Sequence, residues 1–163
     1  RLVRMYRISV LVYLIATIAI LQGGARTISR HSVNNVLQES KTYKFFTDER
    51  VNWHKAYRYC DKMNTTLASF DNEQEYDQLV EQIKQDTTCA HDGGFWTAGY
   101  LTKEGGARWL KDRKPLKFAP WFPGQPVPDN RIRLVSLRPD YHYKLLAQFM
   151  SSLNYIACEI TTG

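Results

Sequence analysis

The sequence of 163 residues lacks the usual marks of an enzyme. Its four histidines show no metal-ligand spacing, no serine stands in a nucleophile elbow, and no glycine-rich phosphate loop follows a candidate strand. We therefore expect a binding or interaction protein rather than a catalyst. The histidines are His31, His54, His91 and His142, and His54 is interpreted as a surface residue of a helix.

The sequence also lacks a strong excess of charge of one sign. Residues 1–25 contain three of the 22 lysines and arginines and none of the 16 acidic residues, so the remainder has a formal net charge of +3. The lysines and arginines are interpreted as scattered along the sequence rather than aligned along one helix, and this distribution argues against nucleic acid as a partner. Basic residues within 108–117 could attract an acidic glycan or a membrane surface, or could form a solvated strand and turn.

No hydrophobic run is long enough for an ordinary membrane span. The uncharged run from Ile8 to Leu21 has fourteen residues, whereas a spanning helix needs about 20. Three arginines precede the run and small residues follow it, as in a signal peptide, so we expect residues 1–25 to be removed by cleavage before Arg26. The alternative is a retained signal anchor. The first interpretation predicts a secreted, extracellular protein without a membrane span after cleavage.

Residues 26–41 are polar and have no heptad repeat, so we expect a flexible N-terminal segment rather than a multimerising stalk. The remainder is long enough for one domain. Three cysteines in an oxidising compartment imply one disulfide bond and one leftover thiol. The sequence Asn64-Thr65-Thr66 is a glycosylation sequon, which predicts a surface turn at Asn64 if the protein is secreted.

Two stretches have the periodicity of helices. Asn52 is a good N-cap, and apolar residues then recur on one face as far as Cys60. A second helix is predicted after Asp71, an acidic N-cap with Gln74 at the N3 position, and should end near Lys84. The apolar positions are Trp53, Ala56, Tyr57 and Cys60 in the first helix, and Tyr76, Leu79, Val80 and Ile83 in the second.

Short aromatic and alternating stretches predict strands, bounded by turn residues. The first strand should stop at Thr47-Asp48, and the last should close the domain. The predicted strands cover residues 43–46, 95–100, 107–110, 132–137 and 154–160. Of the four tryptophans, Trp121 is singled out as a possible ligand contact because it borders a loop, whereas the other three are expected in the core.

The segment Trp121–Pro126 and its continuation to Asn130 contain three prolines and a glycine within ten residues. Such a composition excludes a helix or a central strand and predicts a shaped loop. Gln125 precedes a proline, so the peptide bond between them can be cis, and its carboxamide can point outward to a cation or a sugar hydroxyl.

Taken together, these elements resemble the C-type lectin domain, and in chain style the short secreted lectins of insects. The resemblance covers residues 42–161 and rests on Trp53–Cys60, Thr66–Ser69, Phe95–Gly99, Trp121–Pro126 and Ile156–Glu159 in the order and spacing of the family. It implies an α+β fold in which two helices flank small antiparallel sheets, with a long irregular loop region. It also implies that the terminal strands pair and that Cys60 bonds Cys158, which leaves Cys89 free or available for a disulfide-linked dimer.

The resemblance assigns calcium ligands to positions that this chain has largely changed. Gln125 keeps the first ligand, but Val127 replaces the next, and Leu145-Leu146-Ala147 stands where the family has Trp-Asn-Asp. Asp129 and Asn130 could compensate if the loop shifts by two residues. Because calcium takes 6–8 oxygen ligands, we expect no metal site and disfavour calcium as a cofactor.

Two functions remain open at this level. The first is a secreted lectin that binds a glycan through Gln125, Asp129, Asn130 and Trp121 without calcium, with galactose preferred if the family's rule for glutamine applies. The second is a lectin-fold module that has lost sugar binding and binds a protein. Fold alone does not decide between them.

Overall fold

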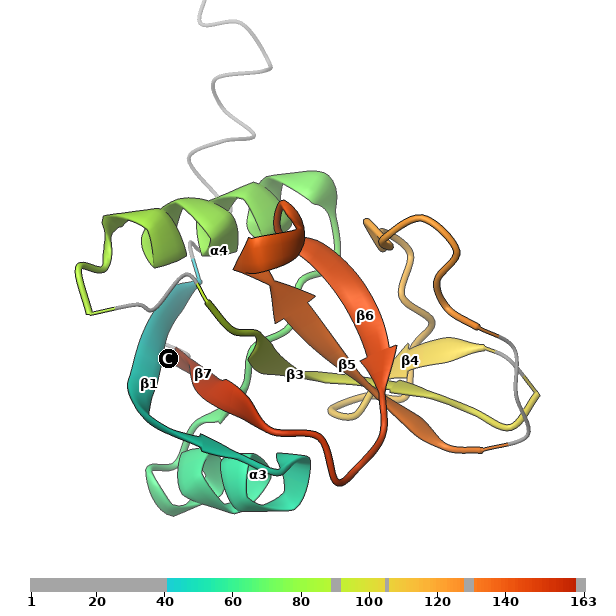
Figure 1. Ribbon diagram of the computed structural model, residues 1–163, viewed down its shortest axis with the longest axis horizontal. Coiled ribbons are helices and arrows are strands. Elements are labelled where there is room, and N and C mark those ends of the chain that lie inside the picture. Colours follow the sequence, from blue (N-terminus) through green and yellow to red (C-terminus); the bar gives the residue numbers. More distant parts are fainter. Residues whose placement is uncertain (1–40, 89–91, 105, 128–130, 161–163) are drawn as a thin grey trace, which may run out of the picture. The chain divides into compact units, whose positions relative to one another are not determined.

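The computed structural model describes residues 41–88, 92–104, 106–127 and 131–160. The leader, Cys89, Asp129 and Asn130 lie outside these ranges. Within them, neither α-helix is long and apolar enough to cross a membrane. The elements, drawn in Figure 1, are β1 (Thr42–Val51), α3 (Trp53–Lys62), β2 (Thr66–Leu67), α4 (Glu73–Gln85), β3 (Phe95–Leu101), β4 (Ala107–Trp109), β5 (Arg133–Arg138), the 3-10 helix η1 (Pro139–Tyr141), β6 (Lys144–Gln148) and β7 (Asn154–Ile160).

The described strands form one seven-stranded sheet in which β1, β7, β3, β5 and β6 lie in that order. The short strands β2 and β4 pair with β7 and β3. All pairs are antiparallel except β3 with β7, which are parallel and join the two halves into a single mixed sheet. The predicted α+β class is therefore confirmed.

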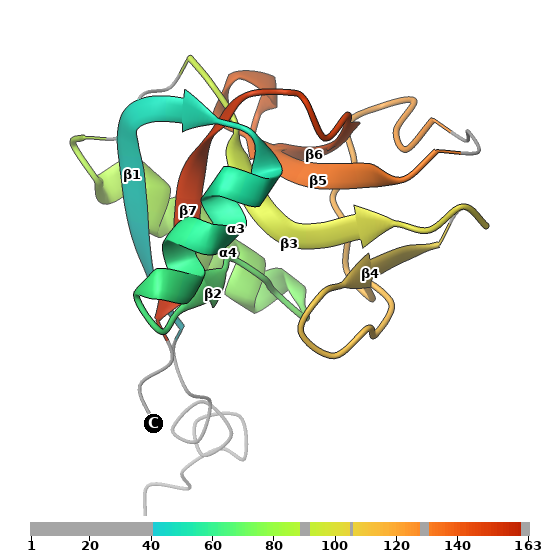
Figure 2. The same ribbon diagram turned by 90° about the horizontal axis from the view of Figure 1, so that it is seen from below.

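The first and last strands pair, as expected, with Tyr43 opposite Glu159 and Phe46 opposite Ile156. The prediction that β1 stops at Thr47-Asp48 is wrong, because β1 continues to Val51. Its register against β7 is irregular between Phe46 and Val51, so the polar residues occupy a distortion rather than an end. Figure 2 shows how β1 curves over and leads directly into α3.

Helix α3 begins as predicted, because the Asn52 side chain accepts a hydrogen bond from the Lys55 N–H at 3.0 Å. Trp53, Ala56 and Cys60 are buried, but Tyr57 at the edge of the same face is 39% exposed. The structure joins Cys60 to Cys158 by a disulfide bond, with Cα atoms 5.6 Å apart. This bond ties α3 to the last strand.

Helix α4 begins one residue later than predicted. The N-cap is Asn72, whose side chain accepts from the Glu75 N–H at 3.0 Å, so Glu75 rather than Gln74 is at N3. The Glu75 carboxylate accepts in return from the Asp71 N–H at 3.1 Å and also pairs with Lys41. The carboxylate at N3 thereby satisfies a backbone donor just before the helix, which decides the position of the cap.

The core lies between the sheet and the two helices and contains three of the four tryptophans, as predicted. Trp96 donates to the Val51 carbonyl at 2.7 Å and Trp53 to the Thr97 carbonyl at 2.9 Å. These two bonds link the end of β1 and the start of α3 to the central strand β3. Trp109 is 2% exposed, whereas Trp121 is only partly buried.

Candidate ligand-binding loop

The loop that carries Gln125 is attached to the sheet through β6, a strand that the sequence patterns did not predict. The Phe122 N–H donates to the Leu145 carbonyl at 3.0 Å, and the Leu145 N–H donates to the Pro120 carbonyl at 2.9 Å. Trp121 forms a bridge with Leu145 and packs against the core. Trp121 therefore positions the loop, and only part of its side chain is available to a ligand.

Gln125 is directed at β6. Its peptide bond to Pro126 is cis, and the preceding Gly124 has φ of +82°, a conformation that favours glycine. The Gln125 Oε1 accepts a hydrogen bond from the Ala147 N–H at 3.3 Å. The structure thus brings the glutamine of the loop against the very residues that the resemblance identifies with the lost Trp-Asn-Asp motif.

The donor set at this position does not fit calcium. Gln125 supplies one neutral oxygen that already accepts an N–H, and Leu146 and Ala147 have no side-chain oxygen. The neighbouring Gln148 uses its Oε1 to accept from Asn154 Nδ2 at 2.6 Å. Among the residues described here, no group of three or more His, Cys, Asp or Glu side chains is placed to hold a metal ion. Calcium binding requires more oxygen ligands than this arrangement offers.

Five apolar side chains are exposed on the Gln125 loop and on the segments just before β5, after β6 and before β7, and we call them the apolar rim. Val127 follows Gln125 by two residues, and Phe149 follows Ala147 by two. Extending the β5–β6 register places Ile132 opposite Met150 and Arg133 opposite Phe149. The members and their exposed fractions are Val127 51%, Ile132 51%, Phe149 42%, Met150 44% and Leu153 58%.

The apolar rim has positive charge beside it. The guanidinium carbons of Arg133 and Arg131 lie 3.6 Å and 4.6 Å from the centre of the Phe149 ring. Such cation–π contacts hold the two arginines over the face of the Phe149 ring. The sequence analysis missed the apolar rim, because Ile132, Phe149 and Met150 become neighbours only through the pairing of β5 with β6.

A second group beside the loop was also missed. The rings of Phe122 and Tyr141 meet edge to face with centroids 4.9 Å apart, and the Arg138 guanidinium lies over the Tyr141 ring at 5.2 Å. Arg138 also donates to Asp140 at 2.9 Å, and this hydrogen bond lowers the pKa of the Asp140 carboxyl. Phe122 alone had a signal in the sequence, since it lies next to Trp121.

Of the other predicted site residues, the structure describes Asn64 but not Cys89, Asp129 or Asn130. Asn64 is exposed in the turn after α3, so its side chain is accessible. Asp129 and Asn130 lie outside the described residues, as does Cys89. Gln125 and Trp121 are the members of the predicted ligand-binding set that the structure describes, and both lie on the loop that docks on β6.

Comparisons with known proteins agree with this fold. The chain is 25% identical over 93 residues to the C-type lectin mosGCTL-7 of Aedes aegypti, covering 56% of this chain and 61% of the relative. It is 31% identical over 91 residues to a perlucin-like protein of Mytilus galloprovincialis, covering 53% and 57%. It is 26% identical over 88 residues to C-type lectin 37Da of Drosophila melanogaster, covering 53% and 46%. The chain thus spans about half the length of these curated relatives.

Solved structures show the same arrangement of elements. An SPL-1–GlcNAc complex superposes with a TM-score of 0.63 at 18% identity, covering 77% of this chain and 91% of the other. Human lithostathine superposes with a TM-score of 0.63 at 22% identity, covering 77% and 86%. At these identities the likeness concerns the fold. The profile of the Lectin C-type domain matches residues 49–136, more than half of the sequence, and the chain belongs to the C-type lectin domain family.

Proposed function

We propose that this protein is a secreted binding protein that recognises a glycan through the Gln125 loop without calcium. The observation that carries the proposal is the hydrogen bond from the Ala147 N–H to Gln125 Oε1, in a position flanked by Leu146 rather than by carboxylates. A calcium ion bridging protein and sugar needs several fixed oxygens, and the described residues do not supply them. Direct hydrogen bonds to sugar hydroxyls are the remaining route.

The chemistry available for a glycan is a carboxamide beside an aromatic surface. Gln125 retains its two N–H donors, because its oxygen is the atom that contacts Ala147. Asp129 and Asn130 would add acceptors and donors, and the partly buried Trp121 would present an edge. Two structural neighbours were determined with sugars, SPL-1 with GlcNAc and the cow CD23 domain in the presence of a GlcNAc2Man3 oligosaccharide. Galactose is the first sugar to test, because the family's glutamine rule favours it.

A protein ligand is the second candidate, and the apolar rim is the observation that favours it. Exposed aromatic and aliphatic side chains flanked by arginines are typical of protein interfaces. A polyol offers little that would bury Met150 or Leu153, which are 44% and 58% exposed. The two candidates therefore differ in which side chains should carry the affinity.

A glycan array probed with and without EGTA tests the proposal. We expect binding that is insensitive to the chelator and lost in Gln125→Ala, with Gln74→Ala on the exposed face of α4 as the matched control. Calorimetry with calcium should show no saturable binding below about 1 mM, the weak end of extracellular modules. Saturable binding that Gln125→Ala or Asp129→Ala abolishes would contradict the proposal.

The same protein preparation distinguishes a protein ligand from a glycan. If the glycan array shows no binding and a protein partner is captured, the double variant Met150→Ser/Leu153→Ser should bind that partner more weakly. The control is Met63→Ser/Leu110→Ser, which removes two exposed apolar side chains of the same types outside the apolar rim. Equal loss in both double variants would show that the interaction is unspecific and would remove the case for a protein ligand.

Export and glycosylation belong to the same proposal. The arginines before residue 8, the apolar run and the small residues at 23–25 support cleavage before Arg26, and the disulfide bond suits an oxidising compartment. The accessible side chain of Asn64 supports use of the sequon. Secreted protein should begin at residue 26 on N-terminal sequencing and lose mass on enzymatic removal of N-linked glycans.

A further inference from the structure

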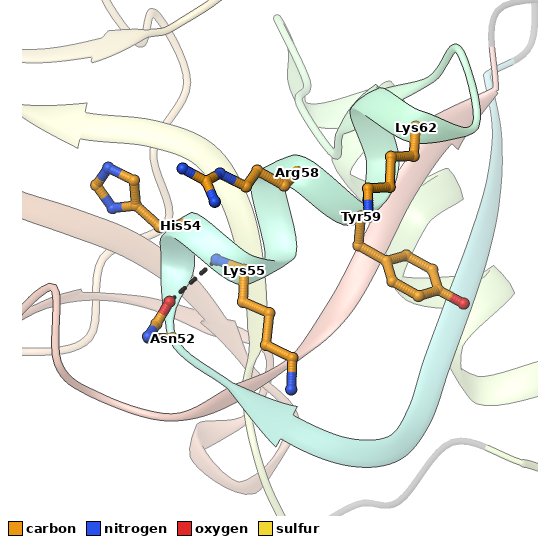
Figure 3. A pocket seen from close by; sticks show the side chains of 6 residues that line it. All are labelled: Asn52, His54, Lys55, Arg58, Tyr59 and Lys62. Carbon is orange, nitrogen blue, oxygen red and sulfur yellow. Dashed lines mark hydrogen bonds between the residues drawn. The ribbon is translucent and has the colours of Figure 1, made fainter.

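The outer face of α3 carries a line of basic side chains that the Gln125 loop does not use. His54, Arg58 and Lys62 follow one another at intervals of four residues, with Lys55 beside them, and we call these four residues the basic stripe. At a rise of 1.5 Å per residue, His54 and Lys62 are about 12 Å apart along the helix axis. Figure 3 shows Arg58 directed towards His54, and Lys62 further along the same helix.

This alignment corrects the interpretation of the basic residues as scattered. All members of the basic stripe are exposed. Lys55 pairs with Glu49 at 2.8 Å, whereas His54, Arg58 and Lys62 have no carboxylate partner among the residues that the structure describes. The stripe lines a shallow hollow of about 470 Å³, to which Asn52 and Tyr59 add an amide and a hydroxyl.

The surroundings make this surface narrow. Asp61 follows Arg58 by three residues on one flank of the same helix, and Glu49 pairs with Lys55 on the other flank. The Tyr59 ring is held in place at the edge of the hollow, because it packs edge to face on Phe46 with ring centroids 4.7 Å apart. The basic side chains therefore form a narrow strip along the helix, with a carboxylate on each side.

We propose that the basic stripe binds a linear sulfated polysaccharide, at a site separate from the Gln125 loop. Cationic groups one helical turn apart match anionic groups repeated along an extended polymer, and Asn52 and Tyr59 can bond its hydroxyl groups. A duplex nucleic acid would need a wider basic surface, since affinity for a duplex comes from neutralising many phosphates along it. An anionic membrane would need apolar side chains to insert beside the charges, and the hollow offers only the packed Tyr59.

The stripe and the loop lie on different parts of the sheet. Helix α3 contacts β2, β7 and β3, whereas the Gln125 loop docks on β6 at the opposite end of the strand order from β1. A ligand on α3 and a ligand on the loop would therefore be bound independently. The proposal goes beyond the function proposed for the loop, and Gln125→Ala should leave it unaffected.

The test is calorimetric titration of the full chain with a heparin octasaccharide and with the same octasaccharide after complete desulfation, in 50 mM and 300 mM NaCl. We expect the sulfated octasaccharide to bind in low salt and more weakly in high salt, because exposed charges are screened, and the desulfated one not to bind. Arg58→Gln/Lys62→Gln should raise the dissociation constant about tenfold, corresponding to the loss of two exposed ionic contacts.

The matched control is Lys103→Gln/Lys111→Gln, which removes the same charge from exposed positions around β4 and should change the dissociation constant less than twofold. N-linked glycans are removed beforehand, because Asn64 follows Lys62 closely. Unchanged melting temperatures show that the variants remain folded. Equal loss in both double variants, no binding by the unaltered chain, or binding to phosphatidylserine vesicles without binding to the octasaccharide would overturn the proposal.

Discussion

At the scale of single residues, Tyr76 supports a strained turn. Its hydroxyl donates to the Tyr143 carbonyl at 2.7 Å, and both Tyr143 and His142 have positive φ values, 59° and 54°. That backbone conformation costs energy in residues other than glycine, so it persists only where contacts hold it. The turn leads into β6, which carries the Gln125 loop. Through this turn, Tyr76 on α4 contributes to the position of the Gln125 loop.

Replacing Tyr76 by phenylalanine tests this role. We expect the free energy of unfolding to fall by about 1 kcal/mol, because the Tyr143 carbonyl loses its donor. Tyr57→Phe is the control, since the Tyr57 ring stacks on Trp53 at 5.4 Å and is 39% exposed. Urea denaturation at pH 7 measures both. Equal losses in the two variants would show that the Tyr76 hydroxyl has no special role.

The same residue makes stability depend on pH in the alkaline range. Burial raises the pKa of Tyr76 from 10.0 to about 12. Since the folded pKa is higher than the unfolded one, this contribution to stability is complete below pH 10 and is lost as the pH rises towards 12. Urea denaturation at pH 9 and pH 10.5 should show a smaller decline for Tyr76→Phe than for the unaltered chain. An identical decline would contradict the assignment to Tyr76.

At the scale of elements, the start of α4 depends on Asn72, whose side chain accepts from the Glu75 N–H, and on Glu75, whose carboxylate accepts from the Asp71 N–H. Asn72→Ala should lower the free energy of unfolding by about 1 kcal/mol, because the Glu75 N–H loses its acceptor. Gln74→Ala, at the exposed second position of the same helix, should change it by less than about 0.5 kcal/mol. Urea denaturation distinguishes the two. A larger effect of Gln74→Ala would instead support the cap at Asp71 that the sequence suggested.

Elements whose signal is local were predictable, and those that depend on distant partners were not. The helices follow from apolar spacing and from capping residues within a few positions. Strand β6 has one buried residue, Leu145, and forms because β5 pairs with one side and the 120–122 segment bonds the other. The extension of β1 past Thr47-Asp48 likewise depends on β7. Neither cause lies within a short window of sequence.

The candidate site also has features with a local sequence signal and features that depend on distant partners. The shape of the loop followed from its prolines and Gly124, and the loss of calcium ligands followed from the resemblance. The contact between Gln125 and Ala147 joins residues 22 positions apart, and the apolar rim requires the exact register of β5 and β6. Glu159 is a further example, because this 2% exposed carboxylate is accommodated by the Ser69 N–H and hydroxyl 90 positions away.

At the scale of the whole molecule, the described domain is closed by contacts between its ends. β1 pairs with β7, and Lys41, just before β1, lies 2.8 Å from Glu75 and 3.6 Å from Glu159. The Cys60–Cys158 bond adds a covalent link between residues 98 positions apart. These closures hold the sheet on which both proposed binding surfaces depend, although neither surface contains the cysteines.

Removing this disulfide should therefore cost much of the stability of the domain without changing either ligand-binding chemistry directly. A loop of about 100 residues corresponds to about 4.7 kcal/mol in the chain-entropy treatment, whereas whole domains are stable by about 5–15 kcal/mol. Cys60→Ala/Cys158→Ala should unfold at a much lower urea concentration than the unaltered chain. Cys89→Ser is the control, because this variant retains the Cys60–Cys158 bond. The same variant tests for a dimer: if the unaltered chain runs as a dimer on a non-reducing gel and Cys89→Ser does not, Cys89 links the two chains. A double variant within 1 kcal/mol of the unaltered chain would mean that strand pairing and the buried Glu159 network alone keep the ends of the domain together.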